Sequence, residues 1–323
     1  KMKNEIIPKK TFYSSSIEKI VLPSNIKLEK SWCKEISNLN KMLIFPNEKQ
    51  NIKKWDNDYI IEKSNLNSNI FDVLIYARRD IEIAIIPPFI KTISSYSFQD
   101  CIHLKEIKMS DKSELQVIGK NAFSKTAIEK IIISKRVFQI GNQAFGNCKN
   151  LTHLEFHKHS MLQSIGDYAF YRASIKSVTI PSSTKIIGKC AFDYCIQLNE
   201  VNIPKNSNLR EIKDMAFAST CIEKFFIPSK LEKIDEFWIL DVFSLNEVTI
   251  SPDNQNFAYI NEKMIVTKSD PKKDIFDILF LALKNIKKAN IPPTVKKIAC
   301  CCFNCCKQLT KVRFLGHSEL KII

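Results

Sequence analysis

Five cysteines between positions 300 and 306 form the densest group of potential metal ligands in the sequence. They are Cys300, Cys301, Cys302, Cys305 and Cys306, and they include a Cys-x-x-Cys spacing. Zinc would require three or four of these thiolates to converge on one point. Cys302 and Cys306 occupy inward positions of the repeat described below, whereas the other three diverge. We therefore predict neither a metal site nor a cofactor.

Three further cysteines recur at one constant spacing, on every second coil of the repeat. Cys101, Cys148 and Cys195 each lie three positions after a repeated phenylalanine, as Cys306 does. A separation of two coils is about 10 Å, which exceeds the limit of about 7 Å between the Cα atoms of a disulfide. We expect these thiols to be small buried residues. Cys195 and Cys221 lie on adjacent coils, so the oxidation of this pair is left open.

The remaining sequence indicates no catalytic group. The five histidines have no serine or cysteine nucleophile at a spacing that predicts contact. No glycine-rich phosphate loop is present, and the acidic residues are scattered over variable positions. We predict that this segment is not an enzyme, and that any catalysis would need a domain outside it.

One repeated pattern positions all of these residues. Ile-x-x-x-x-Phe is followed by Leu-x-x-Leu-x-Leu, whose first apolar residue marks each coil and recurs at nearly constant steps outside two long gaps. Such repetition predicts a solenoid. The step from Phe to this marker alternates between two lengths, so two coil types alternate. The markers are Ile17, Leu39, Ile81, Leu104, Ile128, Leu151, Ile175, Leu198, Ile222, Leu245, Ile286 and Leu309.

The Leu-x-x-Leu-x-Leu segments predict strands with one buried face. Their second and third apolar residues alternate with polar ones, as in the segment from Leu151 to Phe156. Twelve such strands would form one continuous parallel sheet on the inner, concave face. The Ile-Gly-x-x-Ala-Phe segments would form short helical or 3-10 turns on the convex side, and their phenylalanine rings would stack as the spine of the core. The prediction is an α/β solenoid.

A longer repeat is superimposed on the short one. A single constant shift places Phe12 on Phe217, Asp72 on Asp277 and Phe98 on Phe303. The two long gaps, at about 47–80 and 253–285, fall at equivalent places, so we interpret them as copies of one insertion. Within them, the pairs Ile60-Ile61 and Ile265-Val266 are typical of strands in small β-hairpins.

The length of 323 residues suits a single repeat domain of about 12 coils over 1–323, because a solenoid buries its core between neighbouring coils. No signal peptide is apparent in Lys1 to Phe12, and the chain starts inside a coil, so we interpret it as a segment of a longer array. The most apolar run, Ile275 to Leu283, has about half the length that a membrane crossing needs. We predict no membrane insertion in this segment.

A known family shares this signature. Ile-Gly-x-x-Ala-Phe, Asn/Asp-x-Cys-x-x-Leu and Ile-Pro, as in Ile187 to Cys195 and Val201 to Pro204, resemble the BspA-like leucine-rich repeat proteins of the treponemal class. The resemblance covers nearly the whole chain. It implies a leucine-rich repeat horseshoe, and a surface antigen or adhesin that is exposed at the cell surface or secreted. The two insertions depart from the plain repeat, although β-hairpin islands are known in such arrays.

The net charge of +15 suggests an anionic partner. The outward positions of the predicted strands nevertheless carry eleven Lys or Arg and eight Glu, so this face has a net charge of only +3. Aromatic side chains on which nucleic-acid bases could stack are nearly absent from this face. We therefore predict no nucleic-acid binding. The cations are Lys19, Lys41, Lys105, Lys108, Lys130, Lys176, Lys224, Lys287, Lys288, Lys311 and Arg313, and the acids are Glu18, Glu82, Glu106, Glu129, Glu155, Glu200, Glu223 and Glu247.

The functional hypothesis is a non-catalytic protein-interaction or adhesion module. Its concave sheet would present variable side chains to a protein or glycan ligand, of host-cell or extracellular origin. The alternative is an intracellular leucine-rich repeat scaffold or regulatory subunit in the cytoplasm. The residues expected to contact the ligand are Lys105, Lys108, His153, Lys176, Asn202, Phe226 and Arg313.

Overall fold

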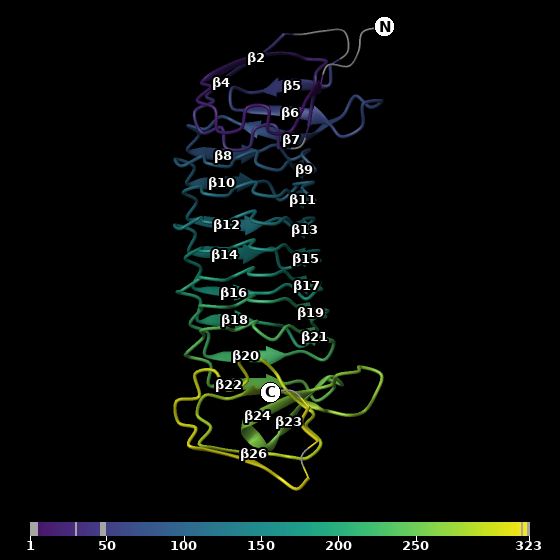
Figure 1. Cartoon of the computed structure of the whole chain (residues 1–323). Helices are drawn as coiled ribbons and strands as arrows, with labels where there is room; N and C mark the ends of the chain where they lie inside the picture. Colours follow the sequence, from purple (N-terminus) through teal and green to yellow (C-terminus); the bar gives the residue numbers. More distant parts are fainter. Residues whose placement is uncertain (1–5, 30, 46–49, 318, 322–323) are drawn as a thin grey trace. The chain divides into compact units, whose positions relative to one another are not determined.

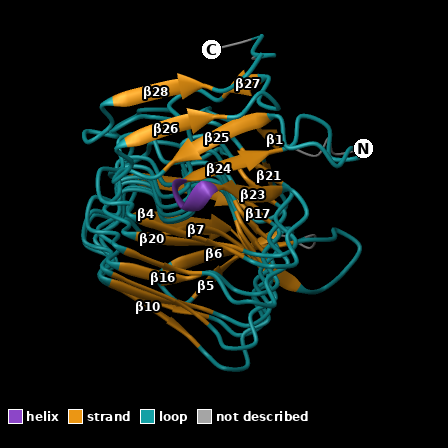
Figure 2. Cartoon of the chain, turned by 90° about the horizontal axis from the view of Figure 1, so that it is seen from below, coloured by secondary structure: helices purple, strands orange, loops and turns teal. Residues whose placement is uncertain are grey.

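The computed structural model describes residues 6–29, 31–45, 50–317 and 319–321. Over these residues the chain folds as a β-solenoid of about 13 turns with almost no helix. It divides into two compact units, 1–174 and 175–323, called unit 1 and unit 2 below. Among the described residues the single helix is the 3-10 turn η1 (Asn261–Lys263), drawn in purple in Figure 2.

Each regular coil contributes two strands. The Leu-x-x-Leu-x-Leu segment forms a marker strand, and the Ile of Ile-x-x-x-x-Phe ends a short bridge strand. The marker strands of unit 1 are β2 (Lys19–Pro23), β4 (Lys41–Phe45), β8 (Ile83–Ile86), β10 (Glu106–Met109), β12 (Lys130–Ile133) and β14 (His153–Phe156). Its bridge strands are β1 (Ile6–Ile7), β3 (Lys27–Leu28), β9 (Thr92–Ile93), β11 (Val117–Ile118), β13 (Gln139–Ile140) and β15 (Ser164–Ile165). Figure 1 shows β8 to β14 and β9 to β15 as two columns of this unit.

Unit 2 is built in the same way. Its marker strands are β16 (Ser177–Thr179), β18 (Glu200–Asn202), β20 (Lys224–Ile227), β22 (Glu247–Ile250), β26 (Lys288–Ile291) and β28 (Lys311–Phe314). Its bridge strands are β17 (Ile186–Ile187), β19 (Glu211–Ile212), β21 (Lys233–Ile234) and β27 (Lys297–Ile298).

The predicted single continuous sheet of marker strands is wrong within each unit. In unit 1, β8, β10, β12 and β14 form one four-stranded sheet, and β2 and β4 form a separate two-stranded sheet. In unit 1, β8 with β10 and β12 with β14 each have four residue pairs in register, whereas β10 and β12 share one, Glu106 with Lys130. In unit 2, β16 pairs with β18 and β20 with β22, but β18 and β20 belong to different sheets. The closely paired strands follow the shorter step between markers, as from Ile81 to Leu104, and the separated ones follow the longer step, as from Leu104 to Ile128. The two coil types seen in the sequence thus correspond to two kinds of junction.

The bridge strands form the more continuous ladder. In unit 1, β9, β11, β13 and β15 pair in parallel, each through two residues. The turns that follow them are not helical, which corrects the predicted convex helices: Asn121 and Lys125, on either side of Phe123, have φ of 53° and 61°. The amide N–H groups of these three residues donate to carbonyls of the next coil at 2.8–3.0 Å. Left-handed residues at this spacing prevent an α-helix. Hydrogen bonds to the next coil alternate with bonds inside the turn, where the Ala122 and Ser124 N–H groups donate to carbonyls three residues earlier at 3.2 Å.

The glycine after the repeat Ile is needed for close backbone approach. Gly141 in unit 1 has no left-handed φ, yet a Cβ atom there would lie 2.7 Å from the backbone of Gly119 in the preceding coil. Where Ser94 or Lys213 occupies the same slot, the coils accommodate a Cβ. Glycine therefore sets the spacing of particular coils, while the left-handed positions are filled by other residues.

The phenylalanine column is confirmed as the core within each unit. In unit 1 the rings of Phe98, Phe123, Phe145 and Phe170 are fully buried, with successive centroids 4.8, 5.3 and 5.3 Å apart. In unit 2 the rings of Phe192 and Phe217 lie 5.3 Å apart and parallel to within 1°. Burial of each ring contributes roughly 1.5–3 kcal/mol.

Both insertions form a three-stranded antiparallel meander. The first consists of β5 (Ile52–Trp55), β6 (Tyr59–Lys63) and β7 (Phe71–Ala77), and the second of β23 (Phe257–Ile260), β24 (Met264–Thr267) and β25 (Ile278–Ala282). Register irregularities fall at Ile60/Ile61 and Ile265/Val266, which are equivalent positions of the long repeat. In each unit the last strand pairs in parallel with the next bridge strand, β7 with β9 and β25 with β27. Positions 47–49 of the first predicted insertion lie outside the described residues.

Candidate functional site

The seven predicted contact residues lie on the outward side of the marker strands or directly before them. In unit 1, Lys105 precedes β10, Lys108 lies in β10 and His153 in β14, and all three are exposed. In unit 2, Lys176 precedes β16, and Asn202, Phe226 and Arg313 lie in β18, β20 and β28. Of these four only Phe226 is half-buried. Within each unit, no two of these residues lie opposite each other on paired strands.

Several of these side chains have polar partners within the chain. Lys108 Nζ lies 3.4 Å from the carboxylate of Glu106, and Asn202 Nδ2 donates to Glu200 at 2.9 Å. The Nδ1 atom of His153 lies 2.8 Å from the Thr152 hydroxyl. Because such exposed contacts contribute little to stability, a ligand could exchange them at low cost.

A groove of about 310 Å³ opens in unit 1 where β10 and β12 separate. Its apolar part comes from the two strands, and its polar part from Glu106, Lys108 and Lys130 of these strands and from the loops that follow β10, β12 and β14. The lining residues are Glu106, Ile107, Lys108, Met109, Ser110, Asp111, Lys130, Ile131, Ile132, Ser134, Lys135 and His157. The volume is near the lower limit of small-ligand pockets, about 300 Å³.

The groove continues into an aliphatic outward surface. Ile132 on the groove wall is 47% exposed, and Ile83 and Ile85 of β8 are 47% and 63% exposed. The β8–β10 register places Ile85 directly opposite Lys108. Apolar and charged side chains therefore alternate over neighbouring strands of unit 1, a composition suited to protein ligands.

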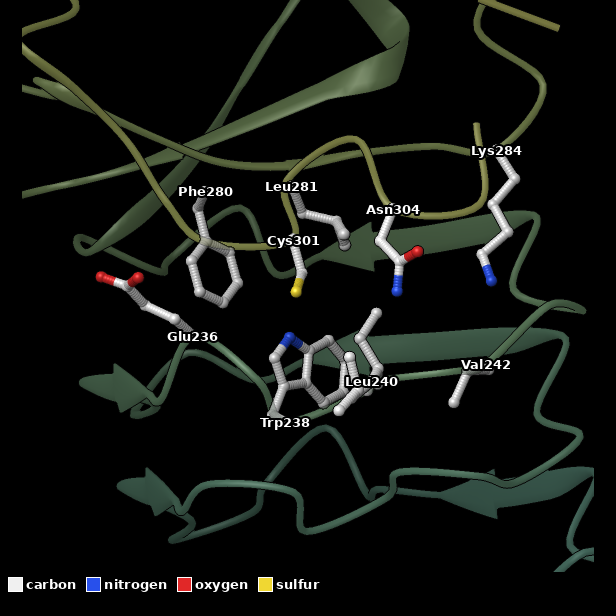
Figure 3. Close-up of a pocket in the computed structure, with 10 residues that line it drawn as sticks. Glu236, Trp238, Leu240, Val242, Phe280, Leu281, Lys284, Cys301 and Asn304 are labelled. Atoms are coloured by element: carbon white, nitrogen blue, oxygen red, sulfur yellow. The ribbon is translucent and has the colours of Figure 1, made fainter. Parts of the chain in front are cut away.

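A second cavity in unit 2 is too small for a ligand. It measures about 20 Å³, close to the space that one water requires. Figure 3 shows the indole ring of Trp238 facing Cys301, with Asn304 and Lys284 on one side and Phe280 on the other. Burial lowers the pKa of Lys284.

The equivalent place in unit 1 is filled by Arg79, which the sequence reasoning missed. Arg79 is 3% exposed, and its Nε donates to the Ile36 carbonyl at 3.0 Å. Its Nη atoms donate to the carbonyls of Ser97 at 2.7 Å and Tyr96 at 3.3 Å. The guanidinium carbon lies 4.5 Å from the centre of the Tyr76 ring. The signal that could have found this residue is the cation kept at equivalent positions of the long repeat, Arg79 and Lys284, two residues after the last strand of each insertion.

None of the eleven cysteines forms a disulfide. Cys101, Cys148, Cys195 and Cys306 are buried, as predicted, and burial raises the pKa of Cys148 to about 11. In the pair left open, Cys195 is buried while Cys221 is exposed and directs its Sγ to the Ile196 carbonyl at 3.2 Å. The described part of the chain contains no group of three His, Cys, Asp or Glu that could hold a metal ion. Nor does it contain a helix long and apolar enough to span a membrane.

The repeat pattern and this geometry agree with one protein family. The model of the BspA type leucine-rich repeat region, a pattern of six copies, matches residues 5–74, 69–162, 163–269 and 273–323. The chain belongs to the BspA-type leucine-rich repeat family. A comparison of its sequence with curated proteins found no match.

Solved structures of similar fold include bacterial leucine-rich repeat proteins. The pneumococcal vaccine antigen PcpA has a TM-score of 0.62 at 18% identity, over 84% of this chain and 66% of PcpA. A leucine-rich cell surface protein from Faecalibacterium prausnitzii has a TM-score of 0.60 at 19% identity, over 84% of this chain and 82% of that protein. A leucine-rich repeat protein from Eubacterium ventriosum has a TM-score of 0.62 at 20% identity, over 80% of this chain and 64% of that protein. At these identities the likeness establishes the fold alone.

Proposed function

We propose that this member of the BspA-type family is a non-catalytic interaction or adhesion module that binds a protein ligand on the outward side of its marker strands. The observation that supports it is the groove between β10 and β12, where a pocket of about 310 Å³ adjoins exposed isoleucines. A protruding side chain of the ligand would enter the groove, and Lys108 and Lys135 would contact its polar rim. The names of PcpA, an antigen, and of the F. prausnitzii cell surface protein favour an exposed location.

The test is a binding screen of the purified chain against immobilised extracellular-matrix and serum proteins by surface plasmon resonance. We expect at least one interaction that Ile132→Asp weakens about tenfold or more, as expected for a central contact. The matched control is Lys120→Glu, which changes an exposed residue in the turn after a bridge strand. Loss of binding in the control alone would reject the marker-strand side as the binding surface.

The intracellular scaffold is the second candidate. The eleven cysteines without a disulfide favour it, because a reducing compartment keeps cysteines in the thiol form. Antibody labelling of intact cells separates the two locations. Labelling without permeabilisation would support the surface-exposed module, and labelling only after permeabilisation would support the scaffold.

A further inference from the structure

The outward side of β26 and β28 in unit 2 carries four cations and no acidic residue. Lys287 precedes β26, Lys288 lies in β26, and Lys311 and Arg313 lie in β28, all exposed. The parallel register places Lys288 opposite Lys311, and Asn290 opposite Arg313. Within the part of the chain that the structure describes, none of these four cations forms an ion pair. They are called the basic strand pair below.

The other copy of the long repeat shows that this backbone does not require the charges. β8 and β10 of unit 1 have the same type of parallel register, matched over the whole of each strand. At the positions equivalent to the four cations they carry Glu82, Ile83, Glu106 and Lys108, with a net charge of −1 instead of +4. Lys108 also pairs there with Glu106 at 3.4 Å.

Cations on two other marker-strand pairs have acids on the neighbouring strand, whereas Lys19 of β2 lies opposite Lys41 of β4. Lys130 of β12 lies 3.5 Å from Glu155 of β14, and Lys224 of β20 lies 2.8 Å from Glu247 of β22. Like charges directly opposite each other in a sheet are destabilising, so the Lys288–Lys311 pair opposes folding. A bound anion on this face would relieve that repulsion.

We infer that the basic strand pair binds an acidic, extended segment of a protein partner. In an extended chain every second residue points the same way, with a repeat of about 6.7 Å. The same repeat separates Lys311 from Arg313 along β28, so Asp or Glu at alternate positions would face both cations. Neighbouring strands are about 4.8 Å apart, which brings Lys288 within reach of the same carboxylates. The inference rests on the proposed function in that the partner is a protein, but it uses a different surface from the groove.

The test uses a labelled peptide of alternating Glu and Ser, with binding followed by fluorescence anisotropy at low salt. The variant Lys288→Ile/Lys311→Glu places the side chains of Ile83 and Glu106 on an equivalent backbone and changes the charge by −3. We expect peptide affinity to fall about tenfold or more, because two charge contacts are lost and repulsion is added. The control Lys205→Glu/Lys272→Ser also changes the charge by −3, on exposed loop lysines of the same unit, and should reduce affinity less than about twofold.

Several outcomes would overturn the inference. Equal loss in the control would mean that only net charge matters. Equal binding of a peptide with its glutamates in one block would remove the match to an extended strand. Heparin that binds at these residues and displaces the peptide at lower concentration would assign the surface to an anionic glycan instead. Because Ile132→Asp leaves the basic strand pair intact, unchanged peptide binding in that variant separates this inference from the groove proposal.

Discussion

The two copies of the long repeat, residues 6–109 and 211–314, form equivalent strands over their described residues and differ in chemistry. Equivalent strands, register irregularities and capping contacts recur in both: the carboxylate of Asp72 accepts the Ser64 N–H at 3.1 Å, and that of Asp277 accepts the Ser269 N–H at 2.9 Å. Inside, Arg79 is buried in the first copy, while Lys284 borders a water-sized cavity in the second. Outside, β8 and β10 are apolar and ion-paired, while β26 and β28 are basic. The comparison teaches that the repeated apolar frame fixes the path of the chain and leaves the remaining positions free to diverge.

The largest expected difference between the copies lies in the phenylalanine column. Phe98 is fully buried against Phe123, whereas its counterpart Phe303 is only half-buried. We expect Phe98→Ala to cost about 3–5 kcal/mol of unfolding free energy and Phe303→Ala about 1–2 kcal/mol. Urea unfolding followed by tryptophan fluorescence measures both values. Equal losses would show that the two rings are equally important to their cores.

Exchange of the buried cations should give a smaller and asymmetric effect. Arg79→Lys removes donors from the carbonyls of Ile36, Tyr96 and Ser97, and we expect a loss of about 2 kcal/mol. Lys284→Arg places a guanidinium beside the cavity of unit 2, and we expect no loss or a gain of up to about 1 kcal/mol. Thermal melts of both variants test this. An unchanged melting temperature in Arg79→Lys would mean that these buried hydrogen bonds make no net contribution to stability.

The copies should also differ in their response to pH. Burial raises the pKa of Glu62, in β6, to about 7, against the opposing charge of Lys27; the equivalent residue is uncharged Thr267. The native state favours the protonated carboxyl of Glu62. The contribution of this group to the unfolding free energy is therefore fully present below the unfolded-state pKa of 4.5 and is lost as the pH rises through 7. We expect the unfolding free energy to fall by about 1–2 kcal/mol from pH 4.5 to 8 relative to Glu62→Gln. Urea unfolding midpoints at both pH values measure this change, and Glu82→Gln, at an exposed residue, is the control. If the wild type and Glu62→Gln lost stability in parallel as the pH rises, Glu62 would not be the group responsible.

The smallest expected effect concerns the like-charge pair in β26 and β28. Lys311→Glu places an acid opposite Lys288, and we expect the melting temperature to rise by about 1 °C at low salt. The gain should disappear at about 1 M salt, where the screening length is about 3 Å. A gain that persists at high salt would point to packing rather than charge.

Much of the fold could be predicted from the sequence, because the period of the apolar residues reports directly on burial. The Phe column, the buried Cys148 and the duplicated insertions all follow from that pattern. The helical turns could not be predicted correctly, since residues such as Asn121 and Lys125 adopt left-handed φ only when neighbouring coils accept their N–H groups. Of the candidate site, the outward positions were predicted, but the groove residues Ile132, Lys135 and His157 were not. The sequence did contain a signal for the groove, namely the alternation of shorter and longer steps between markers. How these steps affect strand pairing depends on contacts between coils, so it could not be read from the local sequence.

The sequence alone therefore determined which residues face inward and how often the chain turns, because alternation of apolar and polar side chains depends only on local backbone geometry. Only the tertiary structure decided which marker strands pair, where the sheet opens into a groove, and that a guanidinium occupies the core of unit 1. These features depend on contacts between residues of different coils, such as Glu106 with Lys130 and Arg79 with Ile36. Register between coils is set by hydrogen bonds that exist only once both coils have formed.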